Sequence, residues 1–367
     1  SGPVFRAELE AAMAHRGLPA PKKILIIPEN HTTNLHYLEN LYYLKTIVAD
    51  AGFEVRLGWY DPRAKDSELG TDYDVSIELQ SFTGKPIRAE RIRVNGNRLT
   101  AGDFDPDLII LNNDFSGGHP AVLDGIEQPI LPPHELGWHS RKKSRHFFHY
   151  NRLAAEFAAI LEVDPWLIQV DTEEVSPVNF AEDEGIEEVA VVVDRMIART
   201  TEAYARHGIQ EKPFVFVKNN AGTYGIGIMV CHSGEEIRNA NRRTKNKMSV
   251  GKNKAVIQSV VVQEGVPTST IVDRLAAEPV IYLSGCELIG GFLRTNSERG
   301  REENLNSQGM VFRKLCMSDL KHPSVSEDTE ADTSEADEDE PILELVYGAI
   351  ARISAVAVGL EIRDRLG

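Results

Sequence analysis

The stretch PFVFVKNNAGTYGIGIMVC, residues 213–231, constrains the fold more than any other part of the chain. Its apolar start, residues 214–217, is rich in β-branched and aromatic side chains, which is typical of a buried strand. Lys218 ends that run, a polar loop with two glycines follows at residues 219–225, and a second apolar segment occupies residues 226–230. Two strands joined by a glycine-containing loop predict a β-hairpin.

A lysine at the exit of a strand, next to a glycine loop, is suited to binding phosphate. Glycines let backbone N–H groups approach phosphate oxygens closely, and the ammonium group of Lys218 adds a point charge. The alternative is a surface hairpin with an exposed lysine, because glycine loops are common in proteins of every class. This stretch alone leaves both interpretations open.

Length and charge bound the class of protein. A chain of 367 residues can hold two or three domains, and its 42% hydrophobic and 26% charged residues are ordinary for a globular protein. The formal net charge of −16 argues against a general nucleic-acid partner, which would need a basic excess. Nine acidic residues and no basic one lie within residues 327–340, which predicts a mobile, solvated acidic loop at 324–341.

Cysteine usage and hydropathy bear on location. The three cysteines, Cys231, Cys286 and Cys316, are widely spaced, which favours reduced thiols in a cytoplasmic protein over a disulfide framework or a zinc site. No uninterrupted apolar run approaches the ~18 residues of a membrane span, so we expect no membrane partner. The oligomeric state is left open, and a homo-oligomer is compatible with the sequence.

The amino-terminal region has the pattern of a parallel sheet. A strand at 24–27, a helix at 35–51 and a strand at 53–59 predict a βαβ unit, and another buried strand is expected at 108–111. Polar clusters follow two of these strands, at residues 29–34 and 112–118. Ligands gather beyond the carboxyl ends of strands in such sheets. We therefore expect substrate contacts from Asn30, Asn113 and Asp114, ordinary loop chemistry being the alternative for any single residue.

A proline-rich linker near residues 129–133 predicts a domain boundary, which divides the chain into residues 1–132 and 133–367. The second part opens with a basic run, Arg141, Lys142, Lys143 and Arg145, expected on a helix. A solvated helix face is the simplest interpretation of the run, and a phosphate-facing lysine is the alternative. Further elements are expected in this order: helices at 186–204 and 234–243, a strand at 255–263, a hairpin at 278–295 and a helix at 341–360.

The order of these elements resembles the ATP-grasp fold, an α/β architecture in which two small α+β lobes close on a nucleotide after an amino-terminal Rossmann-like (pre-ATP-grasp) domain. The resemblance implies that Lys218 contacts the α- and β-phosphates of ATP, that residues 219–225 cover them and that Arg294 faces the γ-phosphate. It implies a hinge at residues 263–266 that meets the adenine and the ribose. The implied ATP-binding residues are Lys218, Asn220, Gly222, Thr223, Tyr224, Gly225, Gln263, Glu264 and Val266.

Longer phrases resemble one family more closely. KNNAGTYGIGIMV, GGFLRTN, ENLNSQGMVFRKLC and IPENHTTNLHYLENL are similar to the proteobacterial glutamate–cysteine ligase of the ATP-grasp type, over residues 22–360. The resemblance implies that ATP and Mg²⁺ serve to join the γ-carboxylate of glutamate to the amine of cysteine through an acyl phosphate. The products would be γ-glutamylcysteine, ADP and phosphate, in the first step of glutathione biosynthesis. The alternatives are another ATP-grasp ligase, such as a glutathione synthetase-like enzyme, and a non-catalytic nucleotide-binding module.

One departure from the family pattern concerns the metal. ATP-grasp enzymes usually hold magnesium with an acidic residue and a Glu-x-Asn pair on their final strands, and this sequence reaches Gly367 directly after the last predicted helix. The nearest candidates are Glu303, Asn304 and Asn306, beside Glu302, because magnesium takes hard oxygen ligands. An exposed polar loop is the alternative. Lys218 and Arg294 are the expected catalytic residues, since acyl-phosphate chemistry needs positioned charge rather than a nucleophilic side chain.

Overall fold

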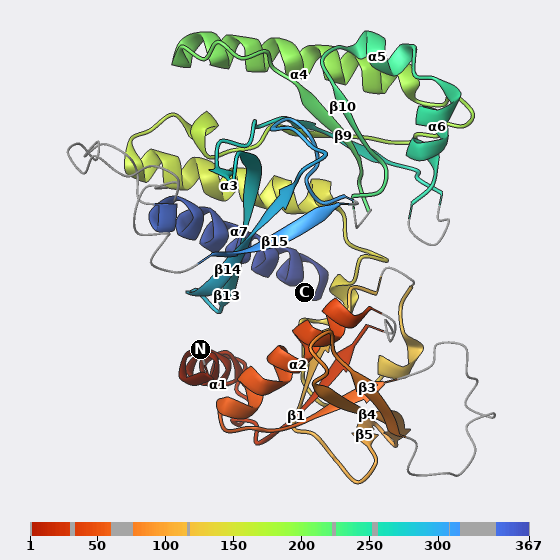
Figure 1. Ribbon diagram of the computed structural model, residues 1–367, viewed down its shortest axis with the longest axis vertical. Coiled ribbons are helices and arrows are strands. Elements are labelled where there is room, and N and C mark those ends of the chain that lie inside the picture. The colour runs from red at the N-terminus through yellow and green to blue at the C-terminus, as the bar shows by residue number, and fades with distance from the viewer. Residues whose placement is uncertain are drawn as a thin grey trace. The chain divides into compact units, whose positions relative to one another are not determined.

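The computed structural model describes residues 2–29, 34–59, 76–115, 118–221, 225–251, 256–307, 309–315 and 343–366. Its internal contacts divide the chain into two compact units, Ser1–Ser140 and Arg141–Gly367. Each unit is described by itself, and Figure 1 labels its elements. The predicted α/β fold class is confirmed.

The first unit is built on one sheet of seven strands in the order β3-β4-β2-β1-β6-β7, with β5 paired to β4. Strands β1, β2, β4, β6 and β7 run parallel where they neighbour one another, and β3 and β5 pair antiparallel with β4. The elements are α1 (Gly2–His15), β1 (Lys23–Pro28), α2 (Leu35–Asp50), β2 (Glu54–Trp59), β3 (Ser76–Gln80), β4 (Pro86–Asn95), β5 (Arg98–Ala101), β6 (Leu108–Asn112), η2 (Ala121–Leu123), β7 (Ile130–Leu131) and η3 (His134–Leu136).

The predicted βαβ unit is confirmed as β1, α2 and β2. Strand β1 is an apolar run buried on both faces, as expected of a central parallel strand. Leu38, Leu41 and Val48 form the buried stripe of α2, and Asn34 caps the helix by accepting a hydrogen bond from the Tyr37 N–H. Strands β4 and β5 are joined by a turn at Asn95-Gly96, with Gly96 at a φ of 63°, which glycine adopts without strain.

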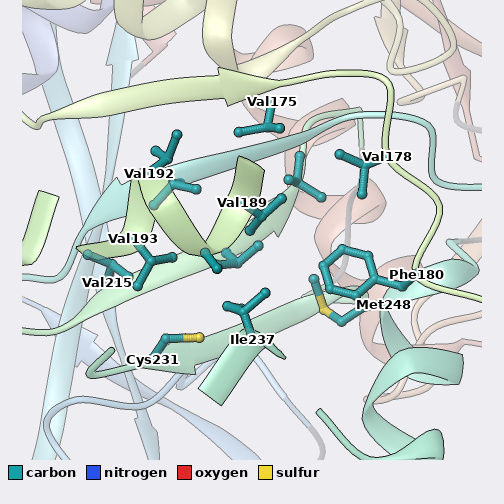
Figure 2. Packing of buried hydrophobic residues seen from close by; sticks show 14 of the residues in the cluster. Val175, Val178, Phe180, Val189, Val192, Val193, Val215, Cys231, Ile237 and Met248 are labelled. Atoms are coloured by element: carbon teal, nitrogen blue, oxygen red, sulfur yellow. The ribbon is translucent and has the colours of Figure 1, made fainter. Parts of the chain in front are cut away.

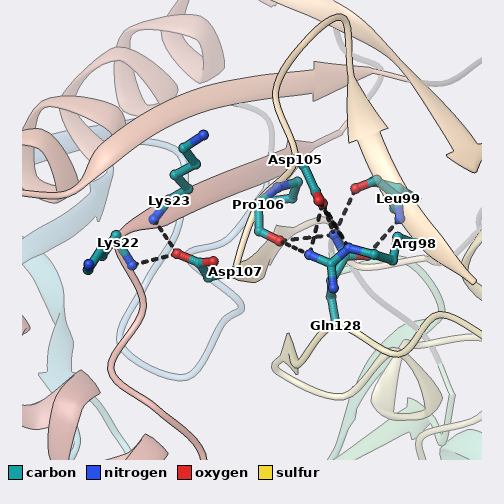
Figure 3. A network of polar contacts seen from close by, with 8 residues as sticks. All are labelled: Lys22, Lys23, Arg98, Leu99, Asp105, Pro106, Asp107 and Gln128. Atoms are coloured by element: carbon teal, nitrogen blue, oxygen red, sulfur yellow. Dashed lines mark hydrogen bonds and ion pairs between the residues drawn. The ribbon is translucent and has the colours of Figure 1, made fainter.

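Figure 3 shows how buried polar groups tie the β5 hairpin to the start of β6. The side chain of Gln128 is almost fully buried, and its Nε2 donates to the carbonyls of Leu99 and Pro106 at 2.8 and 3.0 Å. Its Oε1 accepts from the Leu99 N–H at 2.6 Å. Because every buried group finds a partner, this network stabilises the unit and offers nothing to a ligand.

The second unit contains two antiparallel sheets of four strands, β10-β9-β11-β8 and β12-β13-β14-β15. The elements of the first are β8 (Thr172–Val175), α4 (Ile186–His207), β9 (Val215–Asn219), β10 (Ile228–Cys231), α5 (Gly234–Arg238), α6 (Arg242–Ser249) and β11 (Val260–Glu264). The second is built from β12 (Ile271–Val272), β13 (Leu275–Ser284), β14 (Glu287–Asn296) and β15 (Met310–Leu315). The predicted hairpin of residues 213–231 is confirmed as the β9–β10 pair, with Ile228 opposite Lys218.

One face of the β10-β9-β11-β8 sheet is sealed by helices α4, α5 and α6. Figure 2 shows Val215 and Val175 of the sheet packed against Val189 and Val193 of α4. Helix α4, which the sequence predicts at residues 186–204, therefore packs against the sheet and covers this core. Cys231 lies in the same core, where burial raises the pKa of its thiol to about 12, so it remains an inert, protonated thiol.

A long helix closes the described chain. Helix α7 (Leu343–Leu366) packs along α3 (Lys143–Leu161), and Ala357 of α7 is buried with Tyr150 and Ala154 of α3. Glu361, buried at 2% exposure, accepts hydrogen bonds from Arg141 and His146 at 2.9 and 2.7 Å. Burial alone would raise the pKa of Glu361, but these two partners outweigh it and hold the pKa at about 2.

Part of α7, Leu345–Arg365, is long and apolar enough to cross a membrane by composition, with a mean hydropathy of 1.7. Polar residues interrupt the apolar run within this helix, and the expectation of no membrane partner stays a prediction. A single helix of this kind is weak support for a span, since core helices meet the same criterion.

The acidic loop predicted at residues 324–341 lies outside the residues that the structure describes.

Candidate nucleotide and amino-acid site

Strand alternation places Lys218 on the face of its sheet opposite to the helix-covered core. Val215 and Val217 of β9 belong to that core, so Phe216 and Lys218 point the other way. The ammonium of Lys218 donates to Oε1 of Gln263 on β11 at 2.7 Å and lies 4.6 Å from the centre of the Phe216 ring. Burial lowers the pKa of Lys218 to about 8, against a smaller upward effect of the Glu278 carboxylate.

A second lysine, Lys143, joins this group from the first residue of α3. Its Nζ donates to the carbonyl of Asn219, the last residue of β9, at 2.9 Å. Burial, helped by the nearby charges of Lys218 and Arg141, lowers the pKa of Lys143 to about 8. The sequence left a solvated helix face as the simplest interpretation of the basic run, and the structure places this member of it beside the glycine loop.

Asn220 fixes the position of Lys143. Its side chain is fully buried, its Oδ1 accepts from the Ser144 N–H at 3.0 Å and its Nδ2 donates to Ser144 Oγ at 3.1 Å. The Asn220 carbonyl also accepts from the Lys143 N–H at 2.9 Å. These bonds hold the start of α3 against the end of β9, and contact of Asn220 with a nucleotide stays a prediction.

Arg294 reaches the same region from the other sheet. It lies on β14 directly opposite Glu278 of β13, and its Nε donates to Glu278 Oε1 at 2.6 Å. Glu278 also raises the pKa of Lys218 electrostatically, so its carboxylate acts on both predicted catalytic cations. We call Lys143, Lys218, Gln263, Glu278 and Arg294 the cationic cluster.

The end of the glycine loop contacts the polar loop after β14. Gly225 has a φ of 68°, and a Cβ there would lie 2.5 Å from both Asn304 Nδ2 and the Asn306 carbonyl oxygen. Only glycine allows this approach. A hollow of about 290 Å³ lies next to this contact and is lined in part by Gly225, Lys247, Arg299 and Glu303. Gly222, Thr223 and Tyr224 lie outside the described residues, so their contacts with phosphate stay a prediction.

The predicted metal ligands occupy this loop but are already engaged. Glu303 accepts from Arg299 Nη1 at 2.9 Å and from the Gly300 N–H at 2.8 Å, and both bonds lower the pKa of its carboxyl. Asn304 Oδ1 accepts from the Asn306 N–H at 3.1 Å. Both carboxylate oxygens of Glu303 are therefore already hydrogen-bonded, and binding of magnesium by Glu303, Asn304 and Asn306 stays a prediction.

Glu264 is the last residue of β11, and strand alternation places its side chain on the helix-covered face, opposite to Lys218. Glu264 is 5% exposed, and its carboxylate accepts a hydrogen bond from the Trp166 Nε1–H at 2.9 Å. Burial raises the pKa of this carboxyl. Together with Asp171 and Arg199 it lines a separate hollow of about 390 Å³. The predicted contact with ribose would have to come from the backbone or from a neighbour, such as Val266, which is 66% exposed.

In the first unit, the loops after β1 and β6 meet as the parallel sheet predicts. Asn113 Nδ2 donates to the carbonyl of Pro28 at 3.0 Å, and the Asp114 N–H donates to Glu29 Oε1 at 2.6 Å. Asn113 and Asp114 therefore lie beside the end of β1. Asn30 lies outside the described residues. Contact of these side chains with an amino acid stays a prediction.

Two members of the cationic cluster, Glu278 and Lys143, are not among the site residues that the sequence predicted. Glu278 carries no signal of its own, because it becomes informative only when its strand partner is known to be Arg294. Lys143 was one of four neighbouring basic residues, and only the position of Asn220 singles it out.

Comparison with known proteins gives a consistent result. Residues 4–362 match the family described as glutamate-cysteine ligase. Among solved structures, a candidate gamma-glutamylcysteine synthetase from Methylobacillus flagellatus KT is 34% identical with a TM-score of 0.81, covering 98% of this chain and 82% of that one. D-alanyl-alanine synthetase A from Vibrio cholerae is 11% identical with a TM-score of 0.39, covering 92% of this chain and 81% of that one, too slight a likeness to argue from. No curated protein matches.

Proposed function

Because the chain belongs to the glutamate-cysteine ligase family, it is a ligase that joins glutamate to cysteine, and we propose that its cationic cluster binds the phosphates of ATP. ATP use follows from membership of the family. The roles of individual residues are our proposal. The observation that supports it best is the pair of lysines, Lys143 and Lys218, whose pKa values are both lowered to about 8.

Electrostatics explain why such a pair suits a polyphosphate. At neutral pH both ammonium groups are mostly charged, although burial and, for Lys143, the neighbouring charge disfavour this state. A bound triphosphate would relieve that cost, because its oxygens carry the opposite charge and accept hydrogen bonds. Perturbed pKa values of this kind gather at functional sites more often than elsewhere.

The proposed reaction has two steps. An oxygen of the glutamate γ-carboxylate attacks the γ-phosphorus of ATP, forming an acyl phosphate as the bond to ADP breaks. The cysteine amine then attacks the acyl carbon, loses a proton and expels phosphate, giving γ-glutamylcysteine. Lys143 and Lys218 would neutralise phosphate charge and Arg294, held by Glu278, would face the transferred group.

Magnesium would normally share this neutralisation of phosphate charge. Since Glu303 is engaged by Arg299 and Gly300, we assign no step to a metal held by that loop. The glycine loop would exclude water while the acyl phosphate exists. Asn113, Asp114 and Asn30 would bind an amino-acid substrate, and a cytoplasmic location fits a pathway that starts from free amino acids and ATP.

Isotope transfer tests the reaction. Glutamate labelled with oxygen-18 in its γ-carboxylate should deliver one labelled oxygen to the released phosphate, because that oxygen attacks phosphorus and leaves with it. The assay needs ATP, glutamate and cysteine together, and NMR should place the new amide at the γ carbon. Unlabelled phosphate, or release of AMP and pyrophosphate, would contradict the acyl phosphate. Nucleotide binding without turnover would instead support the non-catalytic module.

A further inference from the structure

The first unit holds a group of two histidines and one aspartate that the ligase chemistry does not use. Nε2 of His119 lies 2.5 Å from Oδ1 of Asp124. The ring of His134 lies beside that of His119, with centroids 5.1 Å apart. One ligand atom from each of His119, Asp124 and His134 falls within 4.8 Å of the other two.

The fold itself brings these side chains together. His119 and Asp124 flank η2 in the segment after β6, and His134 is the first residue of η3 after β7. Strands β6 and β7 are parallel neighbours, with Ile109 opposite Ile130, so the segments that leave them start at the same edge of the sheet. Leu123, at 1% exposure, anchors η2 in the core beneath.

The donor set has a recognisable chemistry. Two imidazole nitrogens and one carboxylate oxygen are the protein ligands of open tetrahedral zinc sites, with bonds of about 2.0–2.2 Å and a fourth position left for another ligand. Such ligand atoms lie roughly 3.5 Å apart. Small side-chain rotations would bring the ligand atoms to that separation, because they now lie within 4.8 Å of one another and the hydrogen-bonded pair of His119 and Asp124 needs to open from 2.5 Å. Imidazole ligands also favour zinc-class ions over magnesium.

Neighbouring groups resemble an outer ligand shell. Glu135 Oε1 lies 3.5 Å from His134 Nε2, and the ring of His139 lies 5.5 Å from that of His119. Carboxylates next to ligating histidines commonly orient the ring and raise its basicity. Two separate surface ion pairs, His119 with Asp124 and His134 with Glu135, would explain each contact. They would not explain why the ligand atoms of both histidines and of Asp124 lie close together.

We propose that His119, Asp124 and His134 bind one divalent transition-metal ion of the zinc class. The side chains are 36%, 60% and 15% exposed respectively, so an ion can enter from solvent, and His134 is the least exposed of the three ligands. The proposed metal site lies in the first unit, whereas the residues of the cationic cluster belong to the second.

Cobalt spectroscopy tests the proposal. The full chain, stripped with a chelator, should bind one Co²⁺ per chain with the intense visible absorption of a tetrahedral ion, and Zn²⁺ but not Mg²⁺ should displace it. His134→Ala and Asp124→Asn should each weaken binding by more than the ~10–100-fold typical of outer-shell changes. His36→Ala is the matched control, because His36 stacks on Phe82 instead.

Folding must be controlled, since His134 is half-buried. Circular dichroism should match the parent, and Asp124→Asn keeps the shape of the exposed side chain while removing its charge. Absence of a stoichiometric tetrahedral signal in the parent chain would overturn the proposal. Equal affinity in folded His134→Ala, Asp124→Asn and His36→Ala would also overturn it, because it would show binding elsewhere.

Discussion

The two faces of the β10-β9-β11-β8 sheet carry opposite kinds of side chain on the same strands. Val217 and Val262 belong to the sealed core under α4, whereas their immediate neighbours Lys218 and Gln263 bond to each other on the other face. Val217 is fully buried among apolar groups, and Lys218 keeps an ammonium where burial lowers its pKa. The apolar face stabilises the fold. On the other face, burial of the Lys218 charge costs free energy, and a bound anion would offset that cost.

The largest expected effect is a loss of ligase activity when a side chain on the Lys218 face of the sheet is removed. Lys218→Ala should lower ligase turnover by about two to three powers of ten, because it removes a charge that we propose binds the phosphates. Steady-state kinetics with ATP, glutamate and cysteine measure it, while circular dichroism confirms the fold.

The control for that substitution is Lys212→Ala, which removes an exposed lysine just before β9. It should leave turnover unchanged. Unaltered kinetics in a folded Lys218→Ala protein would remove the phosphate role from this face of the sheet.

The adjacent residue should give the reverse pattern. Val217→Ala leaves a cavity in the core and should lower the free energy of unfolding of the second unit by about 2 kcal/mol. The kcat of the folded enzyme should change little. Urea denaturation measures the stability, and a large kcat loss without destabilisation would contradict the division between the faces.

The pKa of Lys218 predicts a pH dependence. With amino acids saturating, KM for ATP should rise above pH 8, by roughly tenfold per pH unit for each lysine that loses its proton. Lys143→Arg keeps its charge and should make the rise shallower, since one titration remains. A KM for ATP that stays constant up to pH 10 would count against both lysines.

The same pKa values have a consequence for stability. The lowered folded pKa means that the unfolded chain binds more protons between pH 8 and 10.5. The contribution of Lys218 to the free energy of unfolding should therefore rise with pH across that window. Comparison of the parent with Lys218→Met, which cannot titrate, isolates this contribution.

The smallest expected effect lies in the other unit. Asp114→Asn should raise KM for one amino acid by about tenfold, the size of a hydrogen bond to a charged group, and leave KM for ATP nearly unchanged. Glu127→Gln, on an exposed glutamate of the same unit, is the control. The opposite pattern would assign the loops after β1 and β6 to the nucleotide.

The sequence by itself determined the local elements. Apolar periodicity located β1, α2, α4 and the β9–β10 hairpin, because burial of one stripe or face requires that pattern wherever the chain folds. It missed β8 (Thr172–Val175), whose TEEV sequence reads as a solvated segment, and β15 (Met310–Leu315). Both are outer strands of their sheets, where partners outweigh intrinsic preference.

Tertiary structure alone decided which charged residues meet. Lys143 and Lys218 are separated by 75 positions, Glu278 and Arg294 come from another sheet, and His119 reaches His134 only through the parallel pairing of β6 and β7. Periodicity records which side of an element is buried, but it carries no information on which elements become neighbours. Electrostatic effects depend on distance and burial, so the pKa values of the cluster exist only in the folded chain.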